Sequence, residues 1–580
     1  SVQGFDIREF NPKDFGFGSN VTGITNSSST GYQYYAQRYS MTDDFPFAEI
    51  NVFQLGLYAQ DKWTVSDKLN LTLGLRIDVP FFMTDLQSND KVAAETYRDG
   101  IKIDVSKYPN AKPQFSPRFG FNYKPFDDEN GSLQIRGGTG LFTGTPPYVW
   151  ISNQAGNNGV LFGDLNVRAV KDKNDNIISD GRPSLGFTGN MDTYKPAEGS
   201  ATRSDIAITD PDFKYPSLWK SNIAADYKFG DGWVATVELL YSKDINAIYH
   251  DNIGLYRTEQ FVNDGGAGNA RPYYNGYYSD REGNQKAANH VVMLRNTSKG
   301  HSLYTTFQLQ KNFVDGILKG LYLNGSYSFG QSRGVTDGTS SVATSAWKYR
   351  AALDGNAEEV GYTAGSFDGR LLLSASYTAN WSKYAATSFG LIYQRYRPFR
   401  YSYCYNGDAN GDSQFSNDLM YIPANFDEVK DHLLPGDFDS QEDAWKAMNA
   451  FIEQDPYLSK HRGEYAERNG AVAPFANQLD LSVSHDIKIY QKNGRSHTLR
   501  FSFNIANFLN LLNRNWGVVQ TTVLGNQQYQ FLTIPKGQGP SAANNYTLKY
   551  TMAKDLDETF KDNLNDVSRW QMQFGIKYIF

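Results

Sequence analysis

Apolar and polar residues alternate one by one in long runs, and this pattern recurs from about residue 50 to the end of the chain. In the run 69–79, an apolar side chain stands at every odd position, and Asn, Thr, Gly, Arg and Asp stand between them. A period of two is that of a β-strand with one apolar and one polar face. Together with the run 53–65, the run 69–79 predicts a hairpin whose strands are longer than the usual ~5 to 6 residues of a strand in a globular sheet.

The same plan repeats along the chain and predicts an all-β protein. The further strand pairs are 116–126 with 132–144, 219–229 with 233–242, 302–313 with 321–330, 370–381 with 385–396, and 478–490 with 498–508, followed by a last strand over 570–580. Roughly 16 or 17 segments qualify as strands by this periodicity. Short turns alternate with long connections near 146–216, 249–288, 335–368 and 404–476.

Strand length and this loop asymmetry favour a transmembrane antiparallel β-barrel over a soluble sandwich or propeller. A tilted membrane strand needs ~9 to 11 residues, and outer-membrane barrels have short periplasmic turns and long extracellular loops. The mean hydropathy of -0.55 is consistent with such a barrel, because strands with one lipid-facing and one water-facing side average to a polar value. Aromatic residues reach 15% and gather near strand ends, as in the interfacial girdles of such barrels.

The alternation also predicts which side chains face the lumen. They should solvate the channel and form hydrogen bonds with whatever fills it. These inward positions are Arg76, Asp78, Arg118, Gln134, Arg136, Asp226, Lys228, Glu238, Gln308, Gln310, Asp480 and Arg500.

Composition and motifs exclude several classes of function. The net charge of -6 gives no basic footprint for nucleic acid. A single cysteine, Cys404, excludes an intrachain disulfide framework. The sequence contains no HExxH, GxSxG, GxGxxG or GxxxxGK[ST] motif, so we predict that the chain is not an enzyme. No cofactor is required by this interpretation.

One acidic segment has the spacing of a calcium loop. Asp408, Asn410 and Asp412 repeat the 1-3-5 spacing of oxygen ligands, and Asp418 follows at position 11 instead of 12. Ser413 replaces the usual glycine at position 6. The alternative is an ordinary Asp- and Asn-rich turn. The surrounding long loop 404–476 also predicts a short helix, which Asp439 or Ser440 would cap.

A second loop carries a candidate ligand site. The stretch "ARPYYNGYYSDREGN" concentrates aromatic rings with charged and amide side chains. Rings stack on sugars or peptide side chains, while the polar groups orient a ligand. The candidate residues are Arg271, Tyr273, Tyr274, Tyr277, Tyr278 and Asp280. The alternative is a loop packed on itself.

Several segments, in this order, resemble the barrel of TonB-dependent outer-membrane transporters, in particular the Oar-like branch related to the SusC-type importers. They are "GLYAQDKWTVSDKLNLTLGLRID", "FSPRFGFNY", "QIRGGTGLFTGTPPYVWISNQ", "NGDANGDSQFSNDLMYIP", "YLSKHRGEYAERNGA" and "NLLNRNWG". The resemblance implies a barrel of about 22 strands around a plug domain. The sequence shows neither a TonB box nor a plug-like segment, so we expect residues 1–580 to be the barrel portion, with the plug and first strands outside it.

The resemblance implies active uptake of a nutrient solute, a glycan, a peptide or a chelate, across the cell outer membrane. The implied partners are the inner-membrane TonB motor acting through the plug, a surface lipoprotein, and outer-membrane lipids with lipopolysaccharide. Three alternatives stay open: a passive or protein-export channel, a surface adhesion or assembly protein, and a barrel-embedded hydrolase, for which no catalytic cluster is visible in the sequence.

Overall fold

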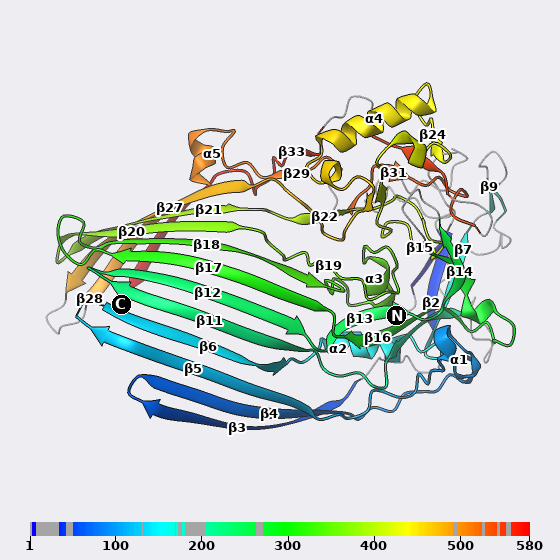
Figure 1. Cartoon of the computed structure of the whole chain (residues 1–580), viewed down its shortest axis with the longest axis horizontal. Coiled ribbons are helices and arrows are strands. Elements are labelled where there is room, and N and C mark those ends of the chain that lie inside the picture. Colours follow the sequence, from blue (N-terminus) through cyan, green and yellow to red (C-terminus); the bar gives the residue numbers. More distant parts are fainter. Residues whose placement is uncertain are drawn as a thin grey trace.

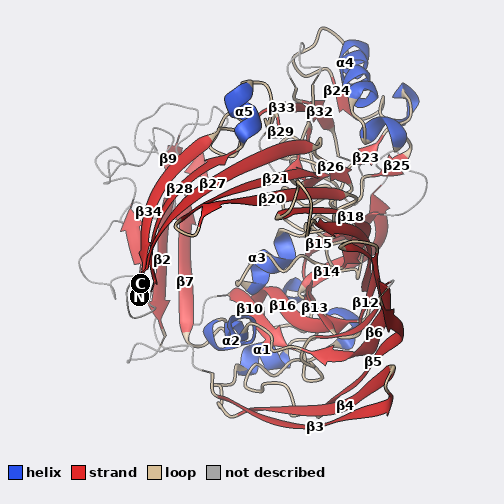
Figure 2. Cartoon of the chain, turned by 90° about the vertical axis from the view of Figure 1, so that its left-hand side faces the viewer, coloured by secondary structure: helices blue, strands red, loops and turns tan. Residues whose placement is uncertain are grey.

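The computed structural model describes residues 3–6, 34–41, 50–129, 131–168, 170–171, 177–179, 203–262, 271–490, 496–524, 528–541, 546–552 and 558–580. Its main feature is a 14-stranded sheet in which each strand pairs with its neighbours in sequence order. All pairings along this path are antiparallel. The strands curve around an open interior, so the sheet forms the wall of a barrel (Figure 2).

The path begins at β3 and ends at β34. Its members are β3 (Val52–Ser66), β4 (Leu69–Phe82), β5 (Gln114–Asp128), β6 (Gly131–Thr143), β11 (Ser217–Phe229), β12 (Trp233–Asp244), β17 (Gly300–Asn312), β18 (Leu321–Gly334), β20 (Arg370–Ser382), β21 (Ala385–Tyr396), β27 (Ala476–Tyr490), β28 (Ser496–Ala506) and β34 (Gln571–Ile579). The fourteenth strand, β19 (Gly361–Tyr362), pairs with β18 alone.

Every hairpin that the periodicity predicts is present in this sheet. The expected total of roughly 16 or 17 strands, counted on periodicity alone, is larger than the 14 of the described sheet. The difference arises because other extended segments pair among themselves in the loops. For example, β10 (Ser204–Thr209) and β13 (Ala247–Asn252) flank β16 (Ala288–Thr297) in a separate small sheet.

The connections alternate in length, as the sequence predicts. Most of the long connections lie toward the right in Figure 1, whereas α5 is drawn above the left half of the strands. Two of the long connections, 83–113 and 507–570, were not predicted. They hold α1 (Asp90–Ala94) with η3 (Arg98–Gly100), and α5 (Phe508–Leu512), respectively. The other helical segments of the loops are α2 (Tyr148–Gly156), η4 (Tyr278–Asp280), α3 (Ala343–Lys348), η5 (Phe426–Glu428), α4 (Gln441–Gln454) and η6 (Leu458–Lys460).

The remaining strands are short and lie in the loops or near the N-terminus. They are β1 (Gln3–Asp6), β2 (Tyr34–Ser40), β7 (Phe162–Arg168), β8 (Val170–Lys171), β9 (Ile177–Ser179), β14 (Leu255–Val262), β15 (Arg271–Tyr277), β22 (Arg400–Tyr403), β23 (Tyr421–Ile422), β24 (Leu433–Leu434), β25 (Glu464–Tyr465), β26 (Ala471–Val472), β29 (Gln520–Thr522), β30 (Gln528–Tyr529), β31 (Leu532–Thr533), β32 (Leu548–Tyr550) and β33 (Phe560–Asp562).

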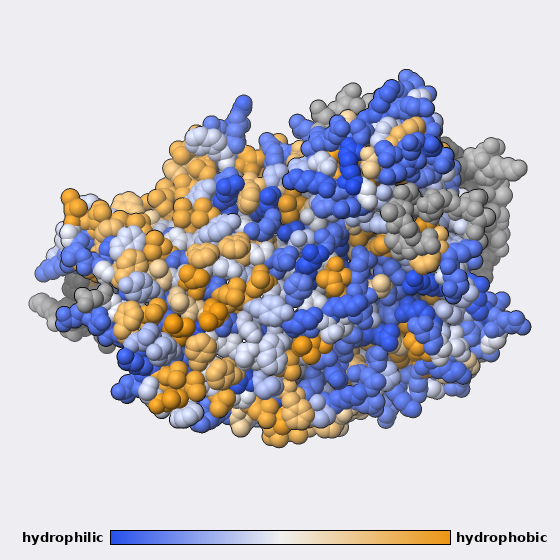
Figure 3. Space-filling view, viewed as in Figure 1, coloured by the Kyte–Doolittle hydropathy of each residue, from blue (hydrophilic) through white to orange (hydrophobic). Residues whose placement is uncertain are grey.

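The apolar face of the main sheet points outward. On β12 and β17, Val237, Leu239, Phe307 and Leu309 alternate with polar residues and are each at least 40% exposed. Figure 3 shows hydrophobic residues gathered over the strands, whereas the loop end is mainly hydrophilic. A soluble protein rarely exposes so continuous an apolar surface. The outer face is therefore the one suited to contact lipid.

Polar residues occupy the opposite face and bind one another across strands. Arg136 on β6 lies 2.9 Å from Asp226 on β11, and the register places Asp226 opposite Gln134. Arg500 and Asp486 form an equivalent pair at 2.6 Å between β28 and β27. This face is the polar lumen side that the alternation predicts.

The largest buried apolar cluster lies in the loops, beyond the strands. Its members include Tyr401, Tyr403, Met448, Phe451 and Phe531. Helix α4 contributes to it and stands where the sequence predicts a helix. The Ser440 side chain accepts a hydrogen bond from the Asp443 amide at its N-terminus. The loops therefore form a folded layer with a core of their own.

Among the described residues, no helix combines the length and apolar character needed to span a bilayer.

Replacing an outward side chain by a charge should cost far more stability than the same change on the inner face. We expect Val237→Arg to lower the free energy of unfolding in lipid vesicles by about 2–4 kcal/mol, because its side chain meets hydrocarbon. Gln308→Arg is the matched control on the neighbouring strand, where Gln308 stands opposite Thr236. Urea-induced unfolding, followed by tryptophan fluorescence, measures both. Equal losses for the two variants would contradict the assignment of faces.

Candidate functional site: a polar cavity at the loop end

The loops converge over one end of the sheet and enclose a cavity. Helix α3 lies within the curve of the sheet in the end-on view and beyond the loop ends of the strands in the side view (Figures 1 and 2). The cavity has a volume of about 500 Å³. The residues that line it are Thr336, Asp337, Thr339, Ala346, Tyr349, Arg350, Ala351, Ser402, Ser416, Arg468, Asn469, Gln528 and Gln530.

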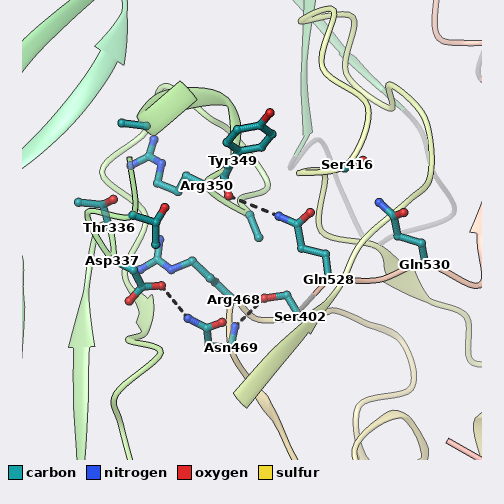
Figure 4. Close-up of a pocket in the computed structure, with 13 residues that line it drawn as sticks. Thr336, Asp337, Tyr349, Arg350, Ser402, Ser416, Arg468, Asn469, Gln528 and Gln530 are labelled. Atoms are coloured by element: carbon teal, nitrogen blue, oxygen red, sulfur yellow. Dashed lines mark hydrogen bonds between the residues drawn. The ribbon is translucent and has the colours of Figure 1, made fainter. Parts of the chain in front are cut away.

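Segments of three long loops build this cavity. The end of α3 supplies Tyr349 and Arg350, β22 supplies Ser402, and β30 supplies Gln528. Arg468 comes from the end of the long loop between β21 and β27. Figure 4 shows the two arginines near Thr336 and Asp337, with Gln528 and Gln530 on the other side of the cavity.

Among the described residues, Arg350 donates to carbonyl oxygens only. Its guanidinium donates to the carbonyls of Gly355 and Ala357, the latter at 3.1 Å, and makes a long 3.5 Å contact with the carbonyl of Val335. The side chain is buried, and its Nε atom has no hydrogen-bond partner among the described residues. Burial lowers the pKa of the guanidinium from its ordinary value.

Arg468 has the same kind of environment. It donates to the carbonyls of Gly334 and Val335, and its buried Nε is also unpartnered within the described part of the chain. Burial lowers the pKa of Arg468 to about 10, and repulsion from Arg350 acts in the same direction. The two positive groups are close neighbours, because both donate to the carbonyl oxygen of Val335.

Hydrogen bonds fix the neutral side chains around the arginines. The Asn469 side chain donates to Asp337 at 2.9 Å, and the Asn469 amide donates to the Ser402 hydroxyl at 2.8 Å. The Gln528 amide group donates to the Tyr349 carbonyl at 3.3 Å, which joins β30 to the end of α3. Figure 4 shows these contacts as dashed lines. The cavity walls are thus held by links between loops that are distant in sequence.

The residues predicted to line a ligand entrance are divided between the protein interior and the surface. Arg271, Tyr273 and Tyr274 are buried in β15. Arg271 donates to Asp418 at 3.1 Å, and the Tyr274 hydroxyl donates to Asp354 at 2.7 Å. These three side chains hold the loops together and present no surface to a solute.

The other three predicted ligand residues are less buried but also have protein partners. The Tyr277 ring packs edge-on against His290, and Tyr278 packs against Tyr256. Asp280 pairs with Arg203 at 2.5 Å. None of the six predicted residues lines the polar cavity of about 500 Å³. The predicted ligand loop therefore does not form the wall of this cavity.

The predicted calcium loop is a compact turn in which Asn410, Asp412 and Asp418 are buried. Asp408 accepts hydrogen bonds from the amides of Asn410 and Ser413 at 3.2 and 2.8 Å. Asp418 accepts from the Ala409 amide at 2.8 Å, and Asp412 accepts from the Gln414 amide at 2.8 Å.

Burial raises the pKa values of both Asp408 and Asp412, and the negative charges of Asp418 and Asp408 raise that of Asp412 further. Within the described ranges, no group of three or more His, Cys, Asp or Glu side chains has the geometry of a metal site.

Sequence reasoning missed the two cavity arginines. They are separated by more than a hundred positions, in loops without a recognisable motif. Arg468 lies within the quoted stretch "YLSKHRGEYAERNGA". That stretch marked a resemblance to a family but assigned no role to the residue. Only the folding of the loops on one another brings the pair together.

Comparison with known proteins places the chain in a family. The family model described as outer membrane beta barrel domain matches residues 4–540. No curated protein gives a significant match.

Solved structures of outer-membrane receptors and transporters match at low identity. A variant of the ferric enterobactin receptor PfeA of Pseudomonas aeruginosa is 10% identical, with a TM-score of 0.37, over 94% of this chain and 50% of that one. The siderophore receptor PirA of Acinetobacter baumannii is 8% identical, with a TM-score of 0.37, over 83% and 47%.

The outer membrane transporter YddB of Escherichia coli is 9% identical, with a TM-score of 0.34, over 94% and 55%. This chain therefore spans about half the length of these structures. The family match covers most of the chain and agrees with the long antiparallel strands and the outward apolar face. The chain belongs to the outer-membrane β-barrel family, and the long strands of its main sheet lie in the outer membrane.

Proposed function

We propose that the protein takes up a nutrient solute across the outer membrane, with energy from the inner-membrane TonB motor. This chain would supply the barrel wall and the loops that first bind the solute. The observation that carries the proposal is the folded loop layer. It has its own apolar core and surrounds a polar cavity of about 500 Å³ at the mouth of the sheet. That volume lies in the range of small-molecule sites.

The inner face of the sheet supports the same proposal. Ion pairs such as Arg76 with Asp78, at 2.7 Å, and Arg136 with Asp226, at 2.9 Å, stand along it, and both arginines are partly exposed. A polar wall provides a path for a hydrated solute once it has passed the cavity. The coupling to TonB in this proposal rests on the residue patterns that resemble those of TonB-dependent transporters. Glycan, peptide and chelate solutes remain the candidate classes, and a surface lipoprotein remains a candidate partner.

A passive or protein-export channel fits the structure less well. Such a channel conducts through an open mouth, whereas here α3 and the long loops lie over the end of the sheet (Figure 2). An adhesion protein would use the outermost loop surfaces and would have no need of an ordered internal cavity. A surface lipoprotein and lipopolysaccharide would both contact the chain from the outer leaflet side.

Uptake should depend on both this protein and TonB. Cells that lack this gene and cells that lack TonB should both fail to take up the same solute from a defined nutrient mixture, because either loss stops transport. Mass spectrometry of the spent medium measures each solute against wild-type and complemented strains. We expect uptake of that solute to fall to background in both mutants.

Two other results would contradict the proposal. Uptake lost with the gene but retained without TonB would indicate a passive channel. Unchanged uptake of every solute, together with loss of surface attachment, would indicate adhesion.

We also propose that the 408–418 loop binds Ca²⁺ in a structural role. The carboxylate oxygens of Asp408 and Asp412 and the amide oxygen of Asn410 are of the type that calcium prefers, whereas Asp418 is already paired with Arg271. Asp412 is 1% exposed and has no ion pair among the described side chains, so a bound cation would offset its burial. The Asn417 side-chain oxygen is also buried and unpartnered in the described structure.

Calcium should then raise the thermal stability of the loop layer. At a hundredfold excess over the dissociation constant, binding stabilises the folded state by about 2.7 kcal/mol. Thermal unfolding with added Ca²⁺, compared with excess chelator, measures this gain. Asp412→Asn should abolish it, whereas Asp427→Asn, at an exposed position outside the loop, should not. The same melting temperature for the wild type with calcium and with chelator would refute the proposal.

A further inference from the structure

We propose that the cavity holds an oxyanion group of the transported solute, a carboxylate or a phosphate, between Arg350 and Arg468. This inference rests on the proposed uptake function and narrows its substrate class.

The first argument is the missing negative partner. Neither Arg350 nor Arg468 forms an ion pair within the described ranges, although both side chains are about 95% buried. A buried charge that is not paired is costly, and buried arginines are normally matched by carboxylates. Arg271 in the same loop layer has the usual carboxylate partner, because it is equally buried and forms an ion pair with Asp418. The two cavity arginines lack such a partner.

The second argument is the unused hydrogen-bonding capacity. A guanidinium has five N–H donors in a planar fork that suits carboxylate and phosphate oxygens. In both arginines the terminal nitrogens bind carbonyl oxygens, and the Nε–H is left without an acceptor in the described structure. Both side chains line the cavity. An oxyanion entering it would supply the missing negative charge. Because the Nε atoms themselves are buried, it would accept from the terminal N–H groups that these carbonyl oxygens leave unused in the described structure.

The third argument concerns two nearby carboxylates, which are already engaged. Asp337 accepts from the Ala364 amide at 2.8 Å with one oxygen and from Asn469 at 2.9 Å with the other. Glu359 accepts from the Leu353 amide at 2.8 Å. Glu359 favours the charged forms of both arginines from a distance, and Asp337 favours that of Arg468. Neither comes within the 4.0 Å of an ion pair with Arg350 or Arg468 in the described chain.

The remaining walls suit the neutral part of a solute. Gln528 and Gln530 bring amide groups, and Tyr349, which is 57% exposed, lines the same cavity. Amide groups form directional hydrogen bonds, and an exposed ring offers a face for stacking. The arrangement therefore fits a small polar molecule that carries at least one negative group.

Binding of simple oxyanions to the purified protein in detergent tests the inference. Succinate and inorganic phosphate are the two anionic probes, and glucose is the neutral control at the same ionic strength. Isothermal titration calorimetry measures each dissociation constant. We expect at least one anion to bind and glucose to bind much more weakly. Preference for succinate would identify a carboxylate ligand, and preference for phosphate a phosphorylated one.

Variants of the cavity make the test specific. Arg468→Gln and Arg350→Gln should each weaken anion binding about 10- to 100-fold, because each removes a charge-assisted hydrogen bond. Asp337→Asn should strengthen it, because the change removes the nearby negative charge and keeps the shape. Arg271→Gln is the control for a buried arginine outside the cavity and should leave anion affinity unchanged if the variant folds. The shift in gel mobility on heating reports whether each barrel is folded.

The outcomes separate this inference from the proposed function. No binding of either anion by the folded wild type overturns the inference, whatever the uptake result. Anion binding that Arg468→Gln and Asp337→Asn both leave unchanged also overturns it, because another site would then be responsible. Anion binding with the expected variant effects, in cells whose uptake does not require TonB, would support the inference and contradict the coupling to TonB.

Discussion

A membrane strand must satisfy all its backbone hydrogen bonds within the protein, because hydrocarbon offers none. This constraint governs the whole architecture. It requires long strands paired in register with their neighbours, as in β11 and β12, where twelve consecutive residue pairs run from Leu218 with Asp244 to Phe229 with Trp233. It also separates the two faces, since one meets lipid and the other meets water. The apolar surface over the strands in Figure 3 is the direct consequence.

The loops are not subject to this constraint, because they lie outside the membrane. They bury tyrosine, phenylalanine and methionine side chains in clusters of their own, the largest around Tyr403 and Phe531. Buried polar contacts then join loops that are distant in sequence, as Arg271 does with Asp418 and Asn469 does with Asp337. A layer built in this way is rigid enough to shape a cavity. The same contacts leave Arg350 and Arg468 without a negative partner among the described residues, which gives the cavity its chemical character.

The sequence predicts the sheet far better than the site. Strand positions follow from a period of two that every membrane strand must obey, so residues 69–79 and 385–396 are assigned without knowledge of the rest. The helix after Ser440 follows from a local capping pattern. Loop packing has no such local rule. Tyr273 and Tyr274 look like ligand residues in sequence and are buried in the structure, whereas Arg350 and Arg468 carry no signal until the loops fold together.

The account depends on the outward face of the strands being in contact with lipid. Spin labels placed one at a time along residues 234–241 of β12, in the protein reconstituted in vesicles, test this most directly. We predict high oxygen accessibility at 235, 237, 239 and 241, and high accessibility to a water-soluble nickel reagent at the positions between them. Accessibility that does not alternate, or oxygen values that stay low at every position, would contradict a lipid-facing strand.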